Sequence, residues 1–137
     1  MESEGKKILI IEDDPDISDI YESWFESDGY SVVKSSNGLH GATELLKEKF
    51  MVVIVDLNLP LKNGVDIVTF LRKSEFKNQE TPAIIVSGFL KDVGELRELP
   101  KVFLLEKPAS KVDVYKIIKK EASWFIILEI NFTFYLI

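Results

Sequence analysis

The sequence contains no cysteine and a single histidine, His40. The absence of thiols excludes disulfide bonds, thiolate metal sites and a cysteine nucleophile. It also fits a reducing compartment, so we expect a cytoplasmic protein. His40 lies early on the outer side of a predicted helix, where we expect a solvated surface residue and not a metal ligand.

Positive charge is also scarce. The chain has 17 Lys and Arg against 23 Asp and Glu, which gives a net charge of −6. This excess of negative charge argues against a nucleic-acid-binding surface, and no stripe of basic residues offsets it. A small basic cluster is present near the C-terminus at Lys116, Lys119 and Lys120.

Long hydrophobic runs are lacking as well. At the N-terminus the first apolar run covers only residues 8–11, too short for the hydrophobic region of a signal peptide. The apolar stretch at residues 124–137 is too short to span a bilayer comfortably, and Glu129 and Asn131 interrupt it. We therefore expect no membrane association.

What is present is an alternation of short β-rich runs and helical patterns. The expected strands cover residues 7–12, 30–34, 50–55, 82–86 and 101–105, and the expected helices cover residues 15–28, 42–46, 65–72, 90–96 and 111–122. Several of these strands are continuously apolar, which indicates burial on both faces. Five such units with short connections predict one α/β domain over residues 6–122, with a parallel sheet covered by helices on both faces.

Two helices show a clear apolar face. Asp14 can cap the first helix and Pro15 suits its first turn, while Gly29 ends it. In the second helix, Ala42, Leu45 and Leu46 are expected to face inward. The first helix has apolar residues at i, i+3, i+4, i+7 and i+8, namely Ile17, Ile20, Tyr21, Trp24 and Phe25.

Polar side chains follow four of the strands at the point where each strand ends. They are Glu12, Asp13 and Asp14 after the first strand, Asp56 after the third, Ser87 after the fourth, and Glu106 and Lys107 after the fifth. Because the carboxyl ends of parallel strands meet at one edge of a sheet, we expect these side chains to converge there.

This set of residues suits phosphoryl chemistry. Glu12, Asp13 and Asp56 offer the hard oxygen ligands that Mg²⁺ or Mn²⁺ prefers. An aspartate carboxylate can attack a phosphoryl group and form an acyl phosphate. Lys107 would neutralise charge on that group, and Ser87 could donate a hydrogen bond to one of its oxygens.

Each motif taken alone has a simpler explanation. Acidic residues at a helix start often serve as caps, which is the role we expect for Asp14 and Asp16. Asp56 could form a turn, and Lys107 followed by proline is typical of a helix start with a solvated lysine. The occurrence of all the motifs at successive strand ends favours the functional interpretation.

Four segments together resemble the receiver domains of response regulators in two-component systems, the CheY-like family. They are KKILIIEDDP at residues 6–15, VIVDLNLPLKNG at residues 53–64, IVSG at residues 85–88 and LLEKP at residues 104–108. The resemblance covers residues 6–122, and the segments occur in the family's order. It implies a flavodoxin-like sheet with strand order 2-1-3-4-5.

The resemblance also implies residue roles. Asp56 would be the phosphoacceptor, and Mg²⁺ would be held by Glu12, Asp13, Asp56 and the backbone carbonyl of Asn58. Ser87 would be the switch hydroxyl and Lys107 the lysine that pairs with the phosphoryl group, with a cis peptide bond after it.

The phosphodonor implied by the family is a sensor histidine kinase or a phosphotransfer protein. Transfer to the receiver would switch a partner-binding surface. Such a domain is a phosphoacceptor switch that catalyses only its own phosphorylation and dephosphorylation, and not an enzyme acting on a small substrate.

The sequence departs from the family in two places. Leu104 occupies a position where the family commonly has an aromatic residue whose inward movement reports phosphorylation, and Phe103 lies beside it. Residues 89–100 also differ from the usual alanine-rich form. These departures leave open how phosphorylation reaches the partner surface.

Residues 123–137 extend beyond the usual end of a receiver domain. Their alternation of polar and apolar residues from Glu129 onward favours a strand, buried along a sheet edge or in a homodimer. The alternative is a continuing, buried helix. A homodimer could also form through the face of the fourth and fifth helices.

Two other functions remain open from the sequence. A phosphohydrolase with an aspartate nucleophile usually has a second aspartate two residues later, where this chain has Asn58. A receiver-like module could instead signal without phosphorylation, and Leu104 is compatible with that possibility.

Overall fold

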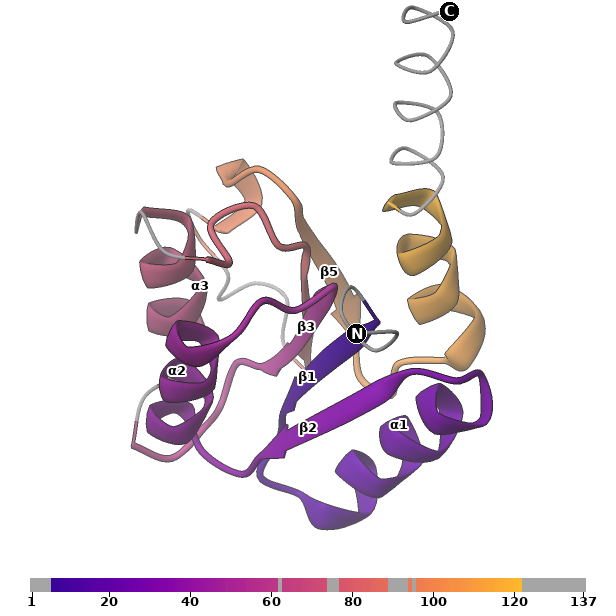
Figure 1. Ribbon diagram of the computed structural model, residues 1–137. Helices are drawn as coiled ribbons and strands as arrows, with labels where there is room; N and C mark the ends of the chain where they lie inside the picture. The colour runs from indigo at the N-terminus through magenta and orange to yellow at the C-terminus, as the bar shows by residue number, and fades with distance from the viewer. Residues whose placement is uncertain (1–5, 62, 74–76, 89–93, 95, 122–137) are drawn as a thin grey trace, which may run out of the picture.

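A parallel sheet of five strands forms the centre of the molecule (Figure 1). The computed structural model describes residues 6–61, 63–73, 77–88, 94 and 96–121. The strand order is β2-β1-β3-β4-β5, which confirms the predicted flavodoxin-like topology. The strands are β1 (Lys7–Ile11), β2 (Ser31–Ser35), β3 (Val52–Asp56), β4 (Ala83–Ser87) and β5 (Val102–Glu106).

Helices cover both faces of the sheet, as predicted (Figure 1). On one face lie α2 (Gly38–Lys47) and α3 (Gly64–Lys73), and on the other lie α1 (Pro15–Ser27) and a helix over residues 111–121. Among the described residues no helix is long and apolar enough to cross a membrane.

Local signals in the sequence explain where the first two helices begin. The Asp14 side chain accepts hydrogen bonds from the backbone N–H groups of Asp16 and Ile17, and Pro15 occupies the first helical position. The Asn37 side chain caps α2 in the same way by accepting from the N–H of His40. The capping role predicted for Asp14 is therefore confirmed.

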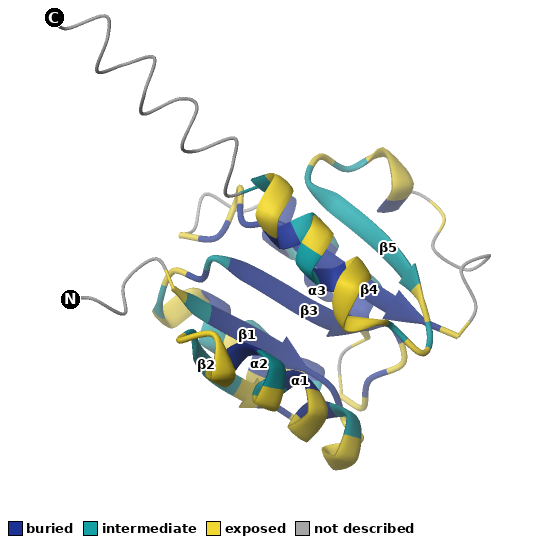
Figure 2. Cartoon of the chain, turned by 90° about the vertical axis from the view of Figure 1, so that its right-hand side faces the viewer, coloured by how far each residue is buried: buried dark blue, intermediate teal, exposed yellow. Residues whose placement is uncertain are grey.

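A hydrophobic cluster fills the space on each side of the sheet. Residues of β1, β3 and β4 are almost fully buried, whereas β5 at the edge is half-buried (Figure 2). Side chains alternate between the faces because successive residues of a strand point to opposite sides. The α2–α3 side buries Leu9, Ile11, Val53 and Ile67, and the α1 side buries Ile8, Ile10, Ile54, Phe25 and Val114.

Two details of the helix prediction are wrong. Ile20 and Leu46 were expected on inner faces, but they are 49% and 43% exposed. In α1 the buried residues are Ser18, Tyr21 and Phe25, so the inner face is narrower than the apolar pattern. A helix that packs on a flat sheet buries a stripe, and residues at its flank stay accessible.

Three strands extend slightly further than the apolar runs indicated. Asp56, Ser87 and Glu106 are the last residues of β3, β4 and β5. Backbone pairing continues through a polar residue, because the ladder depends on main-chain groups and not on side chains. The three side chains are thereby fixed on strands and not on loops.

Two predictions concern residues that lie largely outside the described parts. Of the expected fourth helix over residues 90–96, only Gly94 and Leu96 are described, and both have 3₁₀ conformation, which continues from Leu96 through residue 98. The predicted strand or interface at residues 123–137 lies outside the described residues, and it stays a prediction.

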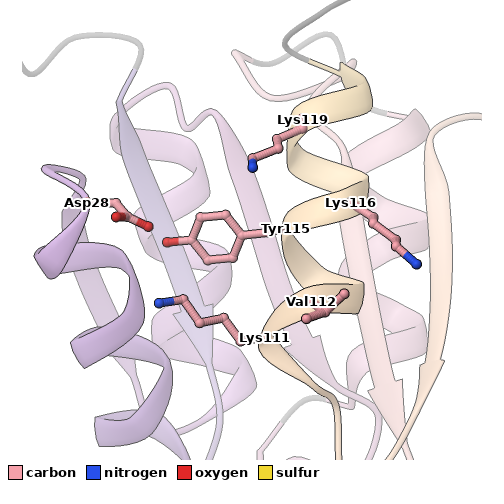
Figure 3. A pocket seen from close by; sticks show the side chains of 6 residues that line it. All are labelled: Asp28, Lys111, Val112, Tyr115, Lys116 and Lys119. Carbon is pink, nitrogen blue, oxygen red and sulfur yellow. The ribbon is translucent and has the colours of Figure 1, made fainter.

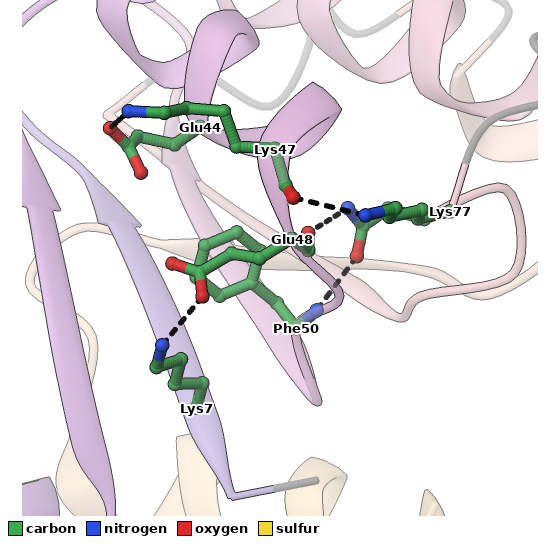
Figure 4. Close-up of polar contacts among 7 residues, drawn as sticks. Lys7, Glu44, Lys47, Glu48, Phe50 and Lys77 are labelled. Carbon is green, nitrogen blue, oxygen red and sulfur yellow. Dashed lines mark hydrogen bonds and ion pairs between the residues drawn. The ribbon is translucent and has the colours of Figure 1, made fainter. Parts of the chain in front are cut away.

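Asn78 connects segments at the edge of the sheet where the strands begin, which we call the amino edge. Figure 4 shows Glu48 and Phe50, two of the residues whose backbone groups Asn78 contacts. Asn78 is fully buried. Its amide nitrogen donates to the carbonyls of Leu45 (2.6 Å) and Glu48 (2.8 Å). Its oxygen accepts from the Phe50 N–H (2.8 Å) and the Thr81 hydroxyl (2.9 Å). One side chain thus joins the α2–β3 and α3–β4 connections.

Arg72 has a similar role at the same edge. Its guanidinium donates to the carbonyls of Pro100 (2.7 Å), Gln79 (3.1 Å), Thr81 and Lys101 (2.9 Å). Burial lowers the pKa of this group, although the charges of Glu121 and Glu80 oppose that effect. The arginine connects α3 to the segments that enter β4 and β5.

Candidate functional site

Three carboxylates meet at the opposite edge of the sheet, where the strands end, which we call the carboxyl edge. One oxygen each from Glu12, Asp13 and Asp56 lies within 4.8 Å of the others. Glu12 and Asp56 are each 4% exposed, and Asp13 is exposed. The sequence prediction that these residues converge is therefore confirmed, and we call them the acidic cluster.

Lys107 lies over two members of the acidic cluster. Its Nζ is 3.1 Å from Asp56 Oδ2 and 3.6 Å from Glu12 Oε1. The peptide bond between Lys107 and Pro108 is cis, as the family resemblance implied. The Lys107 N–H donates to the Ser87 carbonyl (2.9 Å), which extends the pairing of β4 and β5 to this residue. The hydrogen bonding of the sheet therefore fixes the position of the Lys107 backbone relative to Asp56.

Ser87 and Asn58 complete the surroundings of Asp56. Asp56 pairs with Val86 across β3 and β4, so Ser87 lies one residue beyond the aspartate on the neighbouring strand and is 1% exposed. The Asn58 N–H donates to Asp56 Oδ1 (3.2 Å). This backbone contact was not foreseen, because a main-chain donor leaves no signal in the sequence.

A glycine allows the loop after β3 to turn closely over the site. A Cβ atom on Gly64 would lie 2.4 Å from the backbone oxygen of Asp56 and 2.9 Å from Leu57 Cα. The Gly64 N–H donates to the Leu57 carbonyl (3.0 Å). Since the obstructing atoms belong to the backbone, a larger residue here would displace the segment that carries Asp56.

Burial and neighbouring charges change the proton affinity of Glu12 and of Lys107. Burial raises the pKa of Glu12 to about 7, and the nearby charge of Asp56 adds to this effect, while a hydrogen bond from the Asp14 N–H opposes it. Partial burial would lower the pKa of Lys107, but the hydrogen bond and the charge of Asp56 outweigh it and the pKa is raised. The cluster thus favours added positive charge.

The structure places the aromatic neighbour of Leu104 on the other side of the sheet. Leu104 packs against the cluster on the α2–α3 side, whereas Phe103 packs against the cluster on the α1 side. Phe103 therefore does not replace the missing aromatic residue, because adjacent residues of a strand point to opposite faces.

The side chains of the other polar residues singled out in the sequence do not belong to the acidic cluster. Asp14 and Asp16 are exposed at the start of α1. His40 is exposed, with its Nε2 3.4 Å from Glu44 Oε1, which agrees with the expected surface position. Glu106 is also exposed.

A family model described as response regulator receiver domain matches residues 8–119. The response regulator SaeR of Staphylococcus aureus (strain USA300) is 34% identical over 68 residues. That match covers 50% of this chain and 29% of the regulator, so the chain spans less than a third of this curated relative.

Solved structures show the same fold. The receiver domain from Methanospirillum hungatei JF-1 is 26% identical with a TM-score of 0.74, over 85% of this chain and 92% of that one. The receiver domain from Methylobacillus flagellatus is 26% identical with a TM-score of 0.75, over 85% and 98%.

A third structure is the receiver domain of the sensor histidine kinase PA1611 from Pseudomonas aeruginosa PAO1, which has a magnesium ion coordinated in its active site cleft. It is 22% identical with a TM-score of 0.71, over 85% of this chain and 96% of that one. The family model spans most of the sequence, and the fold agrees with it. The chain belongs to the response regulator receiver domain family of two-component systems.

Proposed function

We propose that Asp56 accepts a phosphoryl group from a phosphohistidine in a reaction that depends on Mg²⁺ or Mn²⁺. The observation that carries this proposal is the position of Asp56, within 3.1 Å of the Lys107 ammonium and grouped with Glu12 and Asp13. A nucleophilic carboxylate, two further carboxylates and one ammonium group are the parts that phosphoryl transfer requires.

The donor atoms present fit a divalent cation. Glu12, Asp13 and Asp56 offer carboxylate oxygens close enough to share one ion, and the backbone carbonyl of Asn58 would be a further ligand. The raised pKa of Glu12, which is due first to burial and then to the charge of Asp56, supports the same idea, because a bound cation would stabilise the charged form of these buried carboxylates. When bound, the cation would neutralise charge on the phosphoryl oxygens. The magnesium ion in the PA1611 receiver agrees with this assignment.

The chain's own residues have separate roles in the transfer. An Asp56 oxygen attacks the phosphorus, and the P–O bond forms as the P–N bond of the donor's phosphohistidine breaks. The electron pair returns to the imidazole, which carries a proton on its other nitrogen and leaves as neutral histidine. The Asn58 N–H positions the attacking carboxylate, and Lys107 balances charge on the transferred group.

The switch follows from the added charge. An acyl phosphate on Asp56 presents new acceptor oxygens beside Ser87 and Lys107, which lie on neighbouring segments of the sheet. Contacts made only in the phosphorylated state would shift the protein between two conformations and change a partner-binding surface. We expect this to take place in the cytoplasm, with a sensor histidine kinase or a phosphotransfer protein as donor.

Phosphorylation by a small donor tests the proposal. The protein is incubated with phosphoramidate and Mg²⁺, and its intact mass is followed for wild type, for Asp56→Asn and for Asp16→Asn. We expect wild type and Asp16→Asn to gain one base-labile phosphoryl group and Asp56→Asn to gain none. Addition of EDTA should prevent the gain, because the acidic cluster would then lack its cation.

The same experiment separates the two alternatives. Continuous release of phosphate from many monoesters would identify a phosphohydrolase. No mass gain in wild type, even with a histidine phosphodonor protein present, would identify a module that signals without phosphorylation. A gain in Asp56→Asn equal to that in wild type would disprove the assignment of the acceptor.

A further inference from the structure

A groove of about 350 Å³ opens between the C-terminal end of α1 and the helix over residues 111–121 (Figure 3). None of its lining residues belongs to the acidic cluster. They are Asp28, Lys111, Val112, Tyr115, Lys116 and Lys119. We call this the α1 groove.

Three exposed lysines surround the α1 groove. Among the described residues, no carboxylate lies within 4 Å of the ammonium groups of Lys111, Lys116 or Lys119. Lys34, by contrast, pairs with two acidic residues, and Lys7 pairs with one. Unpaired lysines in a chain of net charge −6 form a local positive field that attracts acidic groups.

The groove also presents an apolar surface that is already in place. Val112 is 63% exposed and lines the groove, so its apolar side chain is accessible to a partner between the lysines. The Tyr115 ring lies 5.8 Å from the Phe25 ring, and its hydroxyl donates to the Trp24 carbonyl (3.0 Å). Lys111 lies 5.5 Å from the centre of the Tyr115 ring. The tyrosine is therefore held as a rigid anchor.

We propose that the α1 groove binds an acidic amphipathic helix of a partner protein. Carboxylates of that helix would pair with Lys116 and Lys119, and an apolar side chain between them would cover Val112. An apolar floor between unpaired lysines suits a protein better than a nucleic acid, since an apolar side chain of a helix can cover Val112 and a phosphate backbone cannot.

Docking in the α1 groove and phosphorylation use different residues. The groove is lined by Asp28 at the end of α1 and by residues of the helix over 111–121, whereas the acidic cluster lies where β1 and β3 end. Binding of the helix should therefore not depend on Asp56, and loss of the phosphoacceptor does not remove the docking surface.

A selection experiment tests the partner chemistry without knowledge of the partner. The full chain is used to select from a display library of random peptides of about 16 residues, long enough for roughly four helical turns. We expect the selected peptides to be enriched in Asp and Glu flanking apolar residues at helical spacing. A selected pool no more acidic than the starting library would overturn the proposal, as would a pool that a DNA oligonucleotide displaces.

Charge reversal locates the binding surface. Affinity of the best peptide is measured by fluorescence anisotropy for wild type, for Lys116→Glu/Lys119→Glu and for the control Lys49→Glu/Lys73→Glu, which changes the net charge equally on other exposed lysines. We expect a loss of roughly tenfold or more for the groove variant and less than about twofold for the control.

Two further variants sharpen the result. Lys116→Arg/Lys119→Arg keeps the charge and should keep the affinity, and Asp56→Asn should bind as wild type does. Equal affinity of wild type and the groove variant, with both shown by circular dichroism to be folded, would place the peptide elsewhere and contradict the proposal.

Discussion

The buried polar side chains at the two edges of the sheet differ in how they are stabilised. At the amino edge, Asn78 makes four hydrogen bonds and Arg72 makes four more, all but one of them with backbone groups. At the carboxyl edge, Glu12 and Asp56 are buried side by side, with Lys107 as their shared cation. At the amino edge, the hydrogen-bonding groups of the buried side chains find their partners within the folded chain. At the carboxyl edge, added positive charge would stabilise the buried carboxylates further.

This difference separates stability from function. Backbone groups do not change charge or leave, so the hydrogen bonds of the amino edge are permanent. Neighbouring buried carboxylates repel one another, so a bound cation would stabilise the carboxyl edge. We therefore expect substitutions at the amino edge to lower stability, and neutral substitutions of the buried carboxylates at the carboxyl edge to raise it while weakening cation binding.

The largest effect is expected for Asn78→Ala. The substitution leaves the buried Phe50 N–H and the carbonyls of Leu45 and Glu48 without their partner. Unpaired buried groups cost about 1 to 3 kcal/mol each, so we expect a loss of about 3 kcal/mol in the free energy of unfolding. Urea unfolding measures it, with the exposed neighbour Gln79→Ala as a control that should change by less than about 0.5 kcal/mol. Equal effects of the two substitutions would contradict the proposed role of the amino edge.

Arg72→Met should have the next largest effect. Methionine keeps most of the apolar stem of Arg72 but removes its donors to four carbonyls. Removal of a buried charge offsets part of the loss, and we expect about 2 kcal/mol of destabilisation by urea unfolding. The adjacent exposed residue offers the control Lys73→Met, which should be nearly neutral. Wild-type stability in Arg72→Met would show that the guanidinium contacts are not stabilising.

Glu12→Gln should raise stability at high pH. The pKa of Glu12 is about 7 in the folded protein against 4.5 as its ordinary value, so the folded state binds the proton more tightly. Metal-free wild type therefore loses stability as the pH rises from about 4.5 to 7, and the penalty is complete above 7. The variant lacks this loss. At pH 8 we expect it to be more stable than wild type by about 1 kcal/mol. This is less than the full pKa difference implies, because solvent at the open rim of the pocket screens the charges. If the two proteins differ in stability by the same amount at pH 5 and at pH 8 in EDTA, Glu12 does not have the raised pKa on which this prediction rests.

The smallest expected effect is that of the cation at low concentration. At a Mg²⁺ concentration equal to its dissociation constant, wild type should gain about 0.4 kcal/mol of stability, rising with further Mg²⁺. Glu12→Gln should gain much less at the same concentration, and Asp16→Asn, which changes an exposed acid outside the cluster, should respond as wild type does. A thermal melt with increasing Mg²⁺ distinguishes the variants. Identical responses in all three would indicate that the ion binds elsewhere.

The sequence allowed most of the carboxyl edge to be predicted. Glu12, Asp56, Ser87 and Lys107 follow or end apolar strands, and parallel strands bring such residues together whatever the details of packing. The amino edge was not predicted. Asn78 and Arg72 bond mainly to backbone carbonyls and N–H groups, and the positions of those groups depend on the folded path of several loops.

The sequence by itself determined the strands, the order of the site residues and the sheet that carries them, because buried parallel strands require continuous apolar runs and place their ends on one edge. Only the tertiary structure decided that Lys107 lies 3.1 Å from Asp56, that Phe103 and Leu104 face opposite sides and that unpaired lysines surround Val112. These features depend on distances between segments far apart in the chain, and such distances are fixed only when the helices pack on the sheet.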